Sequence, residues 1–119
     1  MSKLRKDLDV LLSTVDALCS IPSMNEYLIG HTRLPAWQKA TEYRRVGFQH
    51  LAVLVDKLDR EESLAIEHEL QRSIFASIGS PLLEKYHKEK RDHRVLSRSY
   101  GGSPTDPAIK ECSVYIVWY

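Results

Sequence analysis

The last eight residues, 112–119, are the segment that most constrains the fold of this chain. They read Cys-Ser-Val-Tyr-Ile-Val-Trp-Tyr, with no charge and no proline, and most of them favour β structure. On an exposed sheet edge such a strand would be an aggregation hazard. We therefore expect it to be an interior strand of a sheet or to lie in a subunit interface.

The remaining patterns predict four helices and two further strands around that segment. Their boundaries follow from hydrophobic periodicity and from glycine and proline positions. In chain order they are a helix over 3–18, a strand over 26–30 that ends at Gly30, a helix with Pro35 in its first turn that ends at Gly47, a buried strand over 48–55, a helix over 59–78 and a short helix after Gly79.

Length and composition indicate a single domain. The chain has 119 residues, of which 43% are hydrophobic, enough to build a core without disulfides. We expect one α+β domain over 1–119, with a small, mostly antiparallel sheet of about three strands and helices packed on it. The N-terminal helix lies within 1–20, and the core with its C-terminal strand spans 26–119. Residues 91–109, rich in glycine and proline, predict an irregular loop.

The helix over 59–78 carries the most informative charge. Asp59 and Glu62 form a capping-box pattern at its start. In a helical projection at about 100° per residue, Glu67 falls in the middle of an apolar arc of this helix. The other charged residues of the helix fall outside that arc. The apolar residues of that arc are Leu64, Leu70, Ile74, Phe75 and Ile78. A lone carboxylate in that position needs a cationic partner, a metal or an opening to water.

Two interpretations of Glu67 stay open at this point. In one, it forms an ion pair with an arginine or lysine of a neighbouring element. In the other, it lies at the floor of a cleft and binds a divalent metal.

The charge distribution allows a nucleic-acid partner without requiring one. The net charge is only +1, but basic segments at 33–45 and 82–98 flank the acidic helix. Such segments fit either a phosphate-binding rim or ordinary solvated surface. The residues expected to contact nucleic acid are Arg33, Arg44, Arg45, Lys88 and Arg91.

The two cysteines and the absence of a long apolar run predict a cytoplasmic protein. Cys19 and Cys112 are far apart, match no metal-ligand spacing and are expected to be reduced and buried. No apolar run approaches the roughly 18 residues of a membrane span, so we expect no membrane partner.

The order of motifs in residues 26–75 resembles the GIY-YIG nuclease superfamily. Tyr27-Leu28-Ile29-Gly30 is followed by a helix, a strand and a helix that contains Ala65-Ile66-Glu67-His68-Glu69-Leu70. The tail segments 80–87, 99–102 and 113–115 resemble extensions of some GIY-YIG-like proteins. The N-terminal helix lies outside the resemblance.

The resemblance implies a set of site residues. Glu67 would hold Mg²⁺ or Mn²⁺, and Tyr27 and Tyr115 would help to orient water if their strands pair. Tyr27 matches with one extra residue before the glycine, and Lys39 stands where the family has a phosphate-binding arginine, which removes the bidentate fork. His31, directly after Gly30, is a further candidate.

Two classes of function therefore remain. One is a metal-dependent DNA endonuclease or a DNA-binding relative. The other is a catalytically silent, oligomeric interaction protein that keeps the fold. The aromatic C-terminal strand and the leucine stripe of the first helix also predict a homodimer, with Trp118 or that helix in the contact. Trp37, Ala40 and Tyr43 are expected to face inward.

Overall fold

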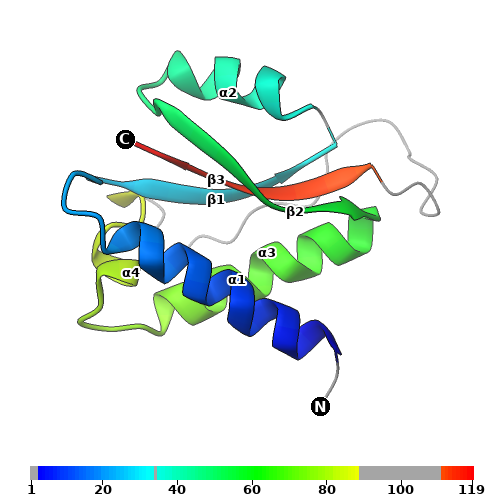
Figure 1. Ribbon diagram of the computed structural model, residues 1–119, viewed down its shortest axis with the longest axis horizontal. Helices are drawn as coiled ribbons and strands as arrows, with labels where there is room; N and C mark the ends of the chain where they lie inside the picture. Colours follow the sequence, from blue (N-terminus) through cyan, green and yellow to red (C-terminus); the bar gives the residue numbers. More distant parts are fainter. Residues whose placement is uncertain (1–2, 34, 89–110) are drawn as a thin grey trace.

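The computed structural model describes residues 3–33, 35–88 and 111–119, and within them the chain forms a three-stranded antiparallel sheet. Strands β1 (Tyr27–Thr32) and β2 (His50–Leu58) flank β3 (Cys112–Trp118), which pairs antiparallel with both (Figure 1). The expected small α+β fold is confirmed. The C-terminal strand is the interior strand of the sheet. This is one of the two positions that its sequence allowed, the other being a subunit interface.

Within the described ranges, four helices cover the two faces of this sheet (Figure 1). Of the helices that the structure describes, only α2 (Ala36–Arg44) lies on one face, where it packs mainly over β2. Helices α1 (Lys3–Cys19), α3 (Arg60–Phe75) and α4 (Pro81–Glu84) lie on the other, where α3 contacts all three strands and α1 packs against α3 and α4. None of the helices in the described part of the chain is long and apolar enough to cross a bilayer.

Strand β3 is buried by its own chain. Val114, Tyr115, Ile116 and Val117 belong to the core, and the ring of Trp118 stacks on His50 at a centroid distance of 5.3 Å. The strand therefore needs no second subunit to cover it. The free thiols of Cys19 and Cys112 are both buried, as expected.

Helix α3 begins where its capping pattern predicts. The Asp59 side chain accepts from the backbone N–H of Glu62 at 2.7 Å, and the Glu62 side chain accepts from the Asp59 N–H at 3.1 Å. This reciprocal pair satisfies two backbone donors that the helix leaves unpaired, and it fixes which face of α3 meets the sheet.

Several sequence-based boundaries and burial predictions were wrong. β1 continues past Gly30 to Thr32, and α3 ends at Phe75, which leaves Ile78 82% exposed. The segment predicted as a fully buried strand is the edge strand β2, with Val53 43% exposed, because β3 takes the centre of the sheet. Trp37 was expected to face inward but is 72% exposed. The expected loop at 91–109 lies outside the described residues.

Side chains from α3 and from the segment after α4 complete the outer edge of β1. The backbone of Tyr27 pairs with this segment, accepting from the His87 N–H at 2.8 Å and donating to the Lys85 carbonyl at 2.9 Å. Two residues further along β1, the Ile29 N–H donates to the Tyr86 hydroxyl at 3.4 Å, and the Ile29 carbonyl accepts from Gln71 Nε2 at 3.4 Å. Two side chains thus take the place of a neighbouring strand, and they place α3 beside this edge.

Candidate functional site

The Glu67 side chain is 0% exposed, which confirms that it points into the core from α3. One carboxylate oxygen, Oε2, contacts Nδ1 of His31, and the other, Oε1, accepts from Gln71 Nε2 at 3.2 Å. The partner of this carboxylate is therefore a histidine of β1, rather than the arginine or lysine that the ion-pair interpretation required.

The carboxylate belongs to a larger hydrogen-bond network. Gln71 Nε2 also lies 3.2 Å from the hydroxyl of Tyr86, which accepts from the Ile29 N–H of β1. Gln71 and Tyr86 are both fully buried. The network links α3, β1 and the segment after α4, so a change at any member reaches the others.

The electrostatic environment keeps His31 neutral. Burial lowers the pKa of its imidazole to about 4, and the nearby charges of His68, Lys39 and Arg60 lower it further in the same direction. Glu67 favours the protonated ring, but withdrawal from water, which is the largest cause, and the nearby charges together outweigh one carboxylate. At pH 7 the contact is therefore a hydrogen bond from Nδ1–H to the carboxylate, which can only accept.

The lowered pKa of His31 predicts a loss of stability in mild acid. The unfolded chain binds a proton near pH 6.5 and the folded chain only near pH 4, so the stabilisation is complete above pH 6.5 and is lost as the pH falls to about 4. The full difference corresponds to about 3 kcal/mol. Urea unfolding at several pH values should show this slope, and His31→Gln should flatten it. An unchanged slope in that variant would assign the acid sensitivity to other groups.

The structure places Tyr27 away from this pair. Its hydroxyl donates to the Leu82 carbonyl of α4 at 2.5 Å, and its ring meets Tyr86 edge-on at 5.1 Å. Burial, with Cys19 alongside, raises the pKa of its phenol far above the ordinary value. Tyr27 therefore anchors β1 to α4.

The structure places Tyr115 on the opposite face of the sheet. Its strand does pair with β1, as the resemblance required, with Tyr115 opposite Gly30. Its hydroxyl hydrogen-bonds the hydroxyl of Tyr43 on α2 at 3.0 Å, whereas Glu67 reaches the sheet from α3. Burial and the neighbouring Tyr43 raise the pKa of Tyr115. The tyrosine pair thus does not converge on Glu67.

The remaining candidates are distributed around the domain. Lys39 is close enough to influence His31 and is paired with Glu42 at 3.0 Å. Arg33, Arg44 and Arg45 are exposed at the two ends of α2. Lys88 is exposed near the start of β1, where its N–H donates to Glu26 at 3.4 Å, and Arg91 lies outside the described residues.

The donor set does not fit a hydrated Mg²⁺ ion. Both oxygens of Glu67 contact protein groups, and the side chain has no exposed surface through which water ligands would complete an octahedron. Within the described ranges, no three His, Cys, Asp or Glu side chains are arranged to hold a metal ion. Metal binding at Glu67 would require His31 or Gln71 to move.

Comparison with protein-family models, with curated proteins and with solved structures finds no match to this chain. The site must therefore be interpreted from its own geometry. The sequence-based candidates include Glu67 and His31 of this network but not Gln71 and Tyr86. Gln71 follows Glu67 by four residues and so lies on the same face of α3, which was a usable signal.

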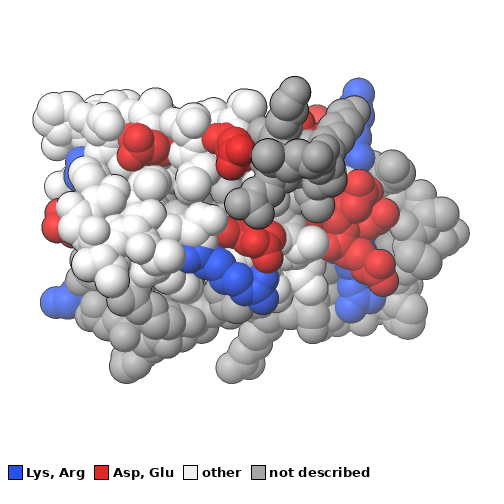
Figure 2. Space-filling model, turned by 90° about the horizontal axis from the view of Figure 1, so that it is seen from below, with Lys and Arg blue, Asp and Glu red and all other residues white. Residues whose placement is uncertain are grey.

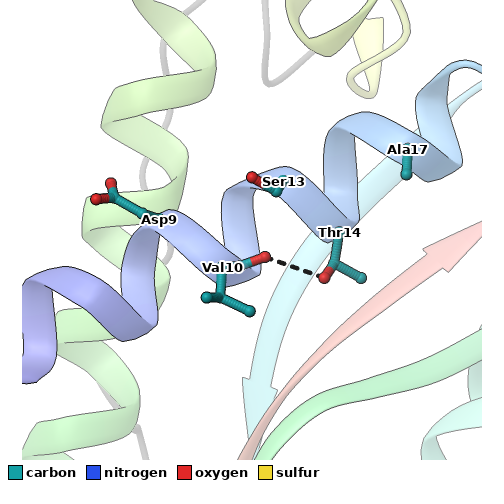
Figure 3. A pocket seen from close by; sticks show the side chains of 5 residues that line it. All are labelled: Asp9, Val10, Ser13, Thr14 and Ala17. Carbon is teal, nitrogen blue, oxygen red and sulfur yellow. Dashed lines mark hydrogen bonds between the residues drawn. The ribbon is translucent and has the colours of Figure 1, made fainter.

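The outer surface of α1 offers little to an anion. Figure 2 shows acidic side chains gathered at the end where α3 begins, whose first turn contains Glu61 and Glu62. The outer surface of α1 has a shallow hollow of about 500 Å³, lined by α1 residues alone (Figure 3). Its threonine hydroxyl is already bonded, from Thr14 to the Val10 carbonyl at 3.0 Å, and no cation lines it. A phosphate is expected to approach from elsewhere.

Proposed function

We propose that this chain is a nucleic-acid-binding domain related to the GIY-YIG nucleases, with a phosphodiester site next to His31 and Glu67. The observation that carries the proposal is the buried His31–Glu67 pair, with His68, Lys39 and Arg60 close enough to act on its charge. A polar pair with two permanent cations, Lys39 and Arg60, near enough to act on it suits a phosphate better than an apolar ligand. The pairing of the Tyr115 strand with β1 also supports the relationship.

The chemistry available to the site is binding and orientation. Lys39 comes from α2 and Arg60 from the first turn of α3, so the two cations proposed to contact phosphate belong to elements on opposite faces of the sheet, and each acts on His31. Glu67 holds the His31 ring in one tautomer, which leaves the Nε2 atom as its acceptor. This arrangement orients a phosphodiester without any group moving in the core.

Removal of either cation should weaken nucleic-acid binding in a salt-dependent way. Binding is driven by counterion release, so the affinity should fall steeply as salt rises. Lys39→Ala and Arg60→Ala should each reduce the slope of log affinity against log salt by about 1. Fluorescence anisotropy of a labelled oligonucleotide, titrated at several salt concentrations, measures this slope.

Arg72→Ala is the matched control, because Arg72 is an exposed arginine of α3 paired with Glu69 at 2.7 Å and away from His31. Its salt slope should equal that of the unmodified chain. Equal slopes for all three variants would contradict the phosphodiester site. Metal-dependent cleavage of DNA is tested by incubating the same oligonucleotide with the chain in EDTA and in Mn²⁺. Cleavage that appears only with Mn²⁺ would support metal binding by Glu67 after rearrangement of its contacts.

A second candidate function is a catalytically silent interaction protein, and specific contacts favour it. The hydroxyls of Tyr27 and Tyr115 are both bonded to protein groups, and both Glu67 oxygens are engaged. No binding of any oligonucleotide at low salt would favour this candidate. A homodimer through the outer surface of α1 belongs to this proposal, since Val10 there is 64% exposed. The cytoplasmic location belongs to either proposal and rests on the two free cysteines.

A further inference from the structure

The largest exposed aromatic side chain of the described residues is Trp37 on α2, with 72% of its surface exposed. The residues of α2 that turn toward the sheet are partly covered, namely Ala36, Ala40 and Tyr43. Trp37 and Arg44 lie on the other side of the helix, both exposed. The indole is therefore exposed to solvent. Among the described helices, α2 is the one that lies on this face of the sheet (Figure 1).

The charge around Trp37 is basic. Arg33 precedes the helix, and Arg44 and Arg45 are exposed at its end. Glu42, the single acid of the helix, is paired with Lys39 at 3.0 Å. This outer surface of α2 thus combines an exposed indole with arginines, whereas acidic side chains gather on the α3 side of the molecule.

An exposed tryptophan among arginines suits a polyanion whose units have flat aromatic faces. Single-stranded nucleic acid has both properties, because its unpaired bases expose their faces for stacking and its phosphates attract arginine. A duplex satisfies only the charge, because its base faces are already stacked on each other. An acidic peptide also satisfies only the charge.

We infer that the outer surface of α2, formed by Trp37, Arg44 and Arg45, is a stacking platform for unpaired nucleotides. This inference rests on the proposed nucleic-acid function and specifies its substrate as single-stranded. Trp37 and Arg44 are seven residues apart, about 10 Å along the helix axis. At about 3.4 Å per stacked nucleotide, this distance spans roughly three nucleotides of one strand.

A groove beside the N-terminus of α2 indicates along which path the bound nucleic acid lies. It has a volume of about 600 Å³ and is lined by Pro35, Val53 and Ser113 together with the carboxylates of Asp56 and Glu111. The carboxylates repel phosphate, so the phosphates are expected to follow α2 from Trp37 toward Arg44 and Arg45. Arg33 also lines this groove.

Titration of the full chain with oligo-dT and oligo-rU tests the platform. The chain has two tryptophans, and the other, Trp118, is half-buried against His50. Stacking should quench the fluorescence of Trp37. Trp37→Ala should abolish this quenching and weaken binding about tenfold, whereas Trp37→Phe should keep most of the affinity. Arg44→Ala should lower the salt slope by about 1 and leave the quenching at saturation unchanged.

Ile78→Ala is the matched control, because Ile78 is an exposed apolar residue beyond the end of α3. Binding of either oligonucleotide with the Trp37 dependence supports the inference, and the tighter one identifies the sugar. Equal affinity of Trp37→Ala and the unmodified chain overturns it. Tighter binding of a duplex, insensitive to Trp37, overturns the platform but keeps the proposed function. No binding of any of these at low salt overturns both.

Discussion

His31→Ala is expected to lower the free energy of unfolding by about 3–5 kcal/mol at pH 7. The substitution leaves the fully buried carboxylate of Glu67 with the hydrogen bond from Gln71 and with a cavity where the imidazole was. Removing the hydrogen-bond donor of a buried carboxylate is costly, because its charge stays poorly compensated, and the cavity adds to this cost. Urea unfolding followed by circular dichroism measures the difference.

Two variants separate the charge from the lost packing. Glu67→Gln removes the buried charge, so the double variant with His31→Ala should be more stable than His31→Ala alone. His87→Ala is the matched control, since His87 contacts Glu26 at 3.1 Å in a pair that is about one-third exposed. That variant should lose at most about 1 kcal/mol. A loss at His31 no larger than at His87 would show that the buried pair is not important for stability.

The burial of Glu67 was predictable because helical periodicity alone fixes which residues of α3 share a face. The capping box fixed the start of that helix, so the wheel was placed correctly. The partner was not predictable in the same way. His31 reaches Glu67 only because β1 runs past Gly30, and this depends on the pairing of Thr32 with Ser113 of β3.

The position of the C-terminal strand was only half predictable. Its composition required burial, and both alternatives, an interior strand or an interface, satisfied that requirement. The choice between them depends on long-range pairing with β1 and β2. The same pairing turned residues 50–58 into an edge strand, which local hydrophobicity does not reveal.

Trp37 shows the opposite error. A tryptophan one residue into a helix is usually buried, and this expectation placed it in the core. The helix α2 is only nine residues long and lies on the sheet through Ala36, Ala40 and Tyr43, so position 37 falls on the outer side. The residue that sequence reasoning placed in the core is now the centre of the inferred binding surface.

Gly30→Ala is expected to destabilise the domain by about 3 kcal/mol or more. The backbone of Gly30 is directly opposite Tyr115 in the pairing of β1 with β3, and a Cβ at this position would lie 2.5 Å from the Cζ atom of that tyrosine. The ring cannot move aside easily, because it is buried and its hydroxyl is bonded to Tyr43 at 3.0 Å. Overpacking in a tight core typically costs 1–3 kcal/mol, and here the displaced ring also loses its hydrogen bond.

A double-mutant cycle with Tyr115→Leu isolates this contact. Leucine lacks the distal ring atoms and the hydroxyl, so Gly30→Ala should cost much less in that background. Alanine also avoids the roughly 0.5–1 kcal/mol by which glycine weakens a strand. A coupling energy of at least about 1.5 kcal/mol is expected from urea unfolding of the four proteins. If Gly30→Ala cost the same with tyrosine and leucine at position 115, the close approach would not explain the glycine. The requirement for glycine at position 30 would then lie in the backbone of β1 itself. The pairing of Gly30 with Tyr115 would then not support the proposed relationship to the GIY-YIG nucleases.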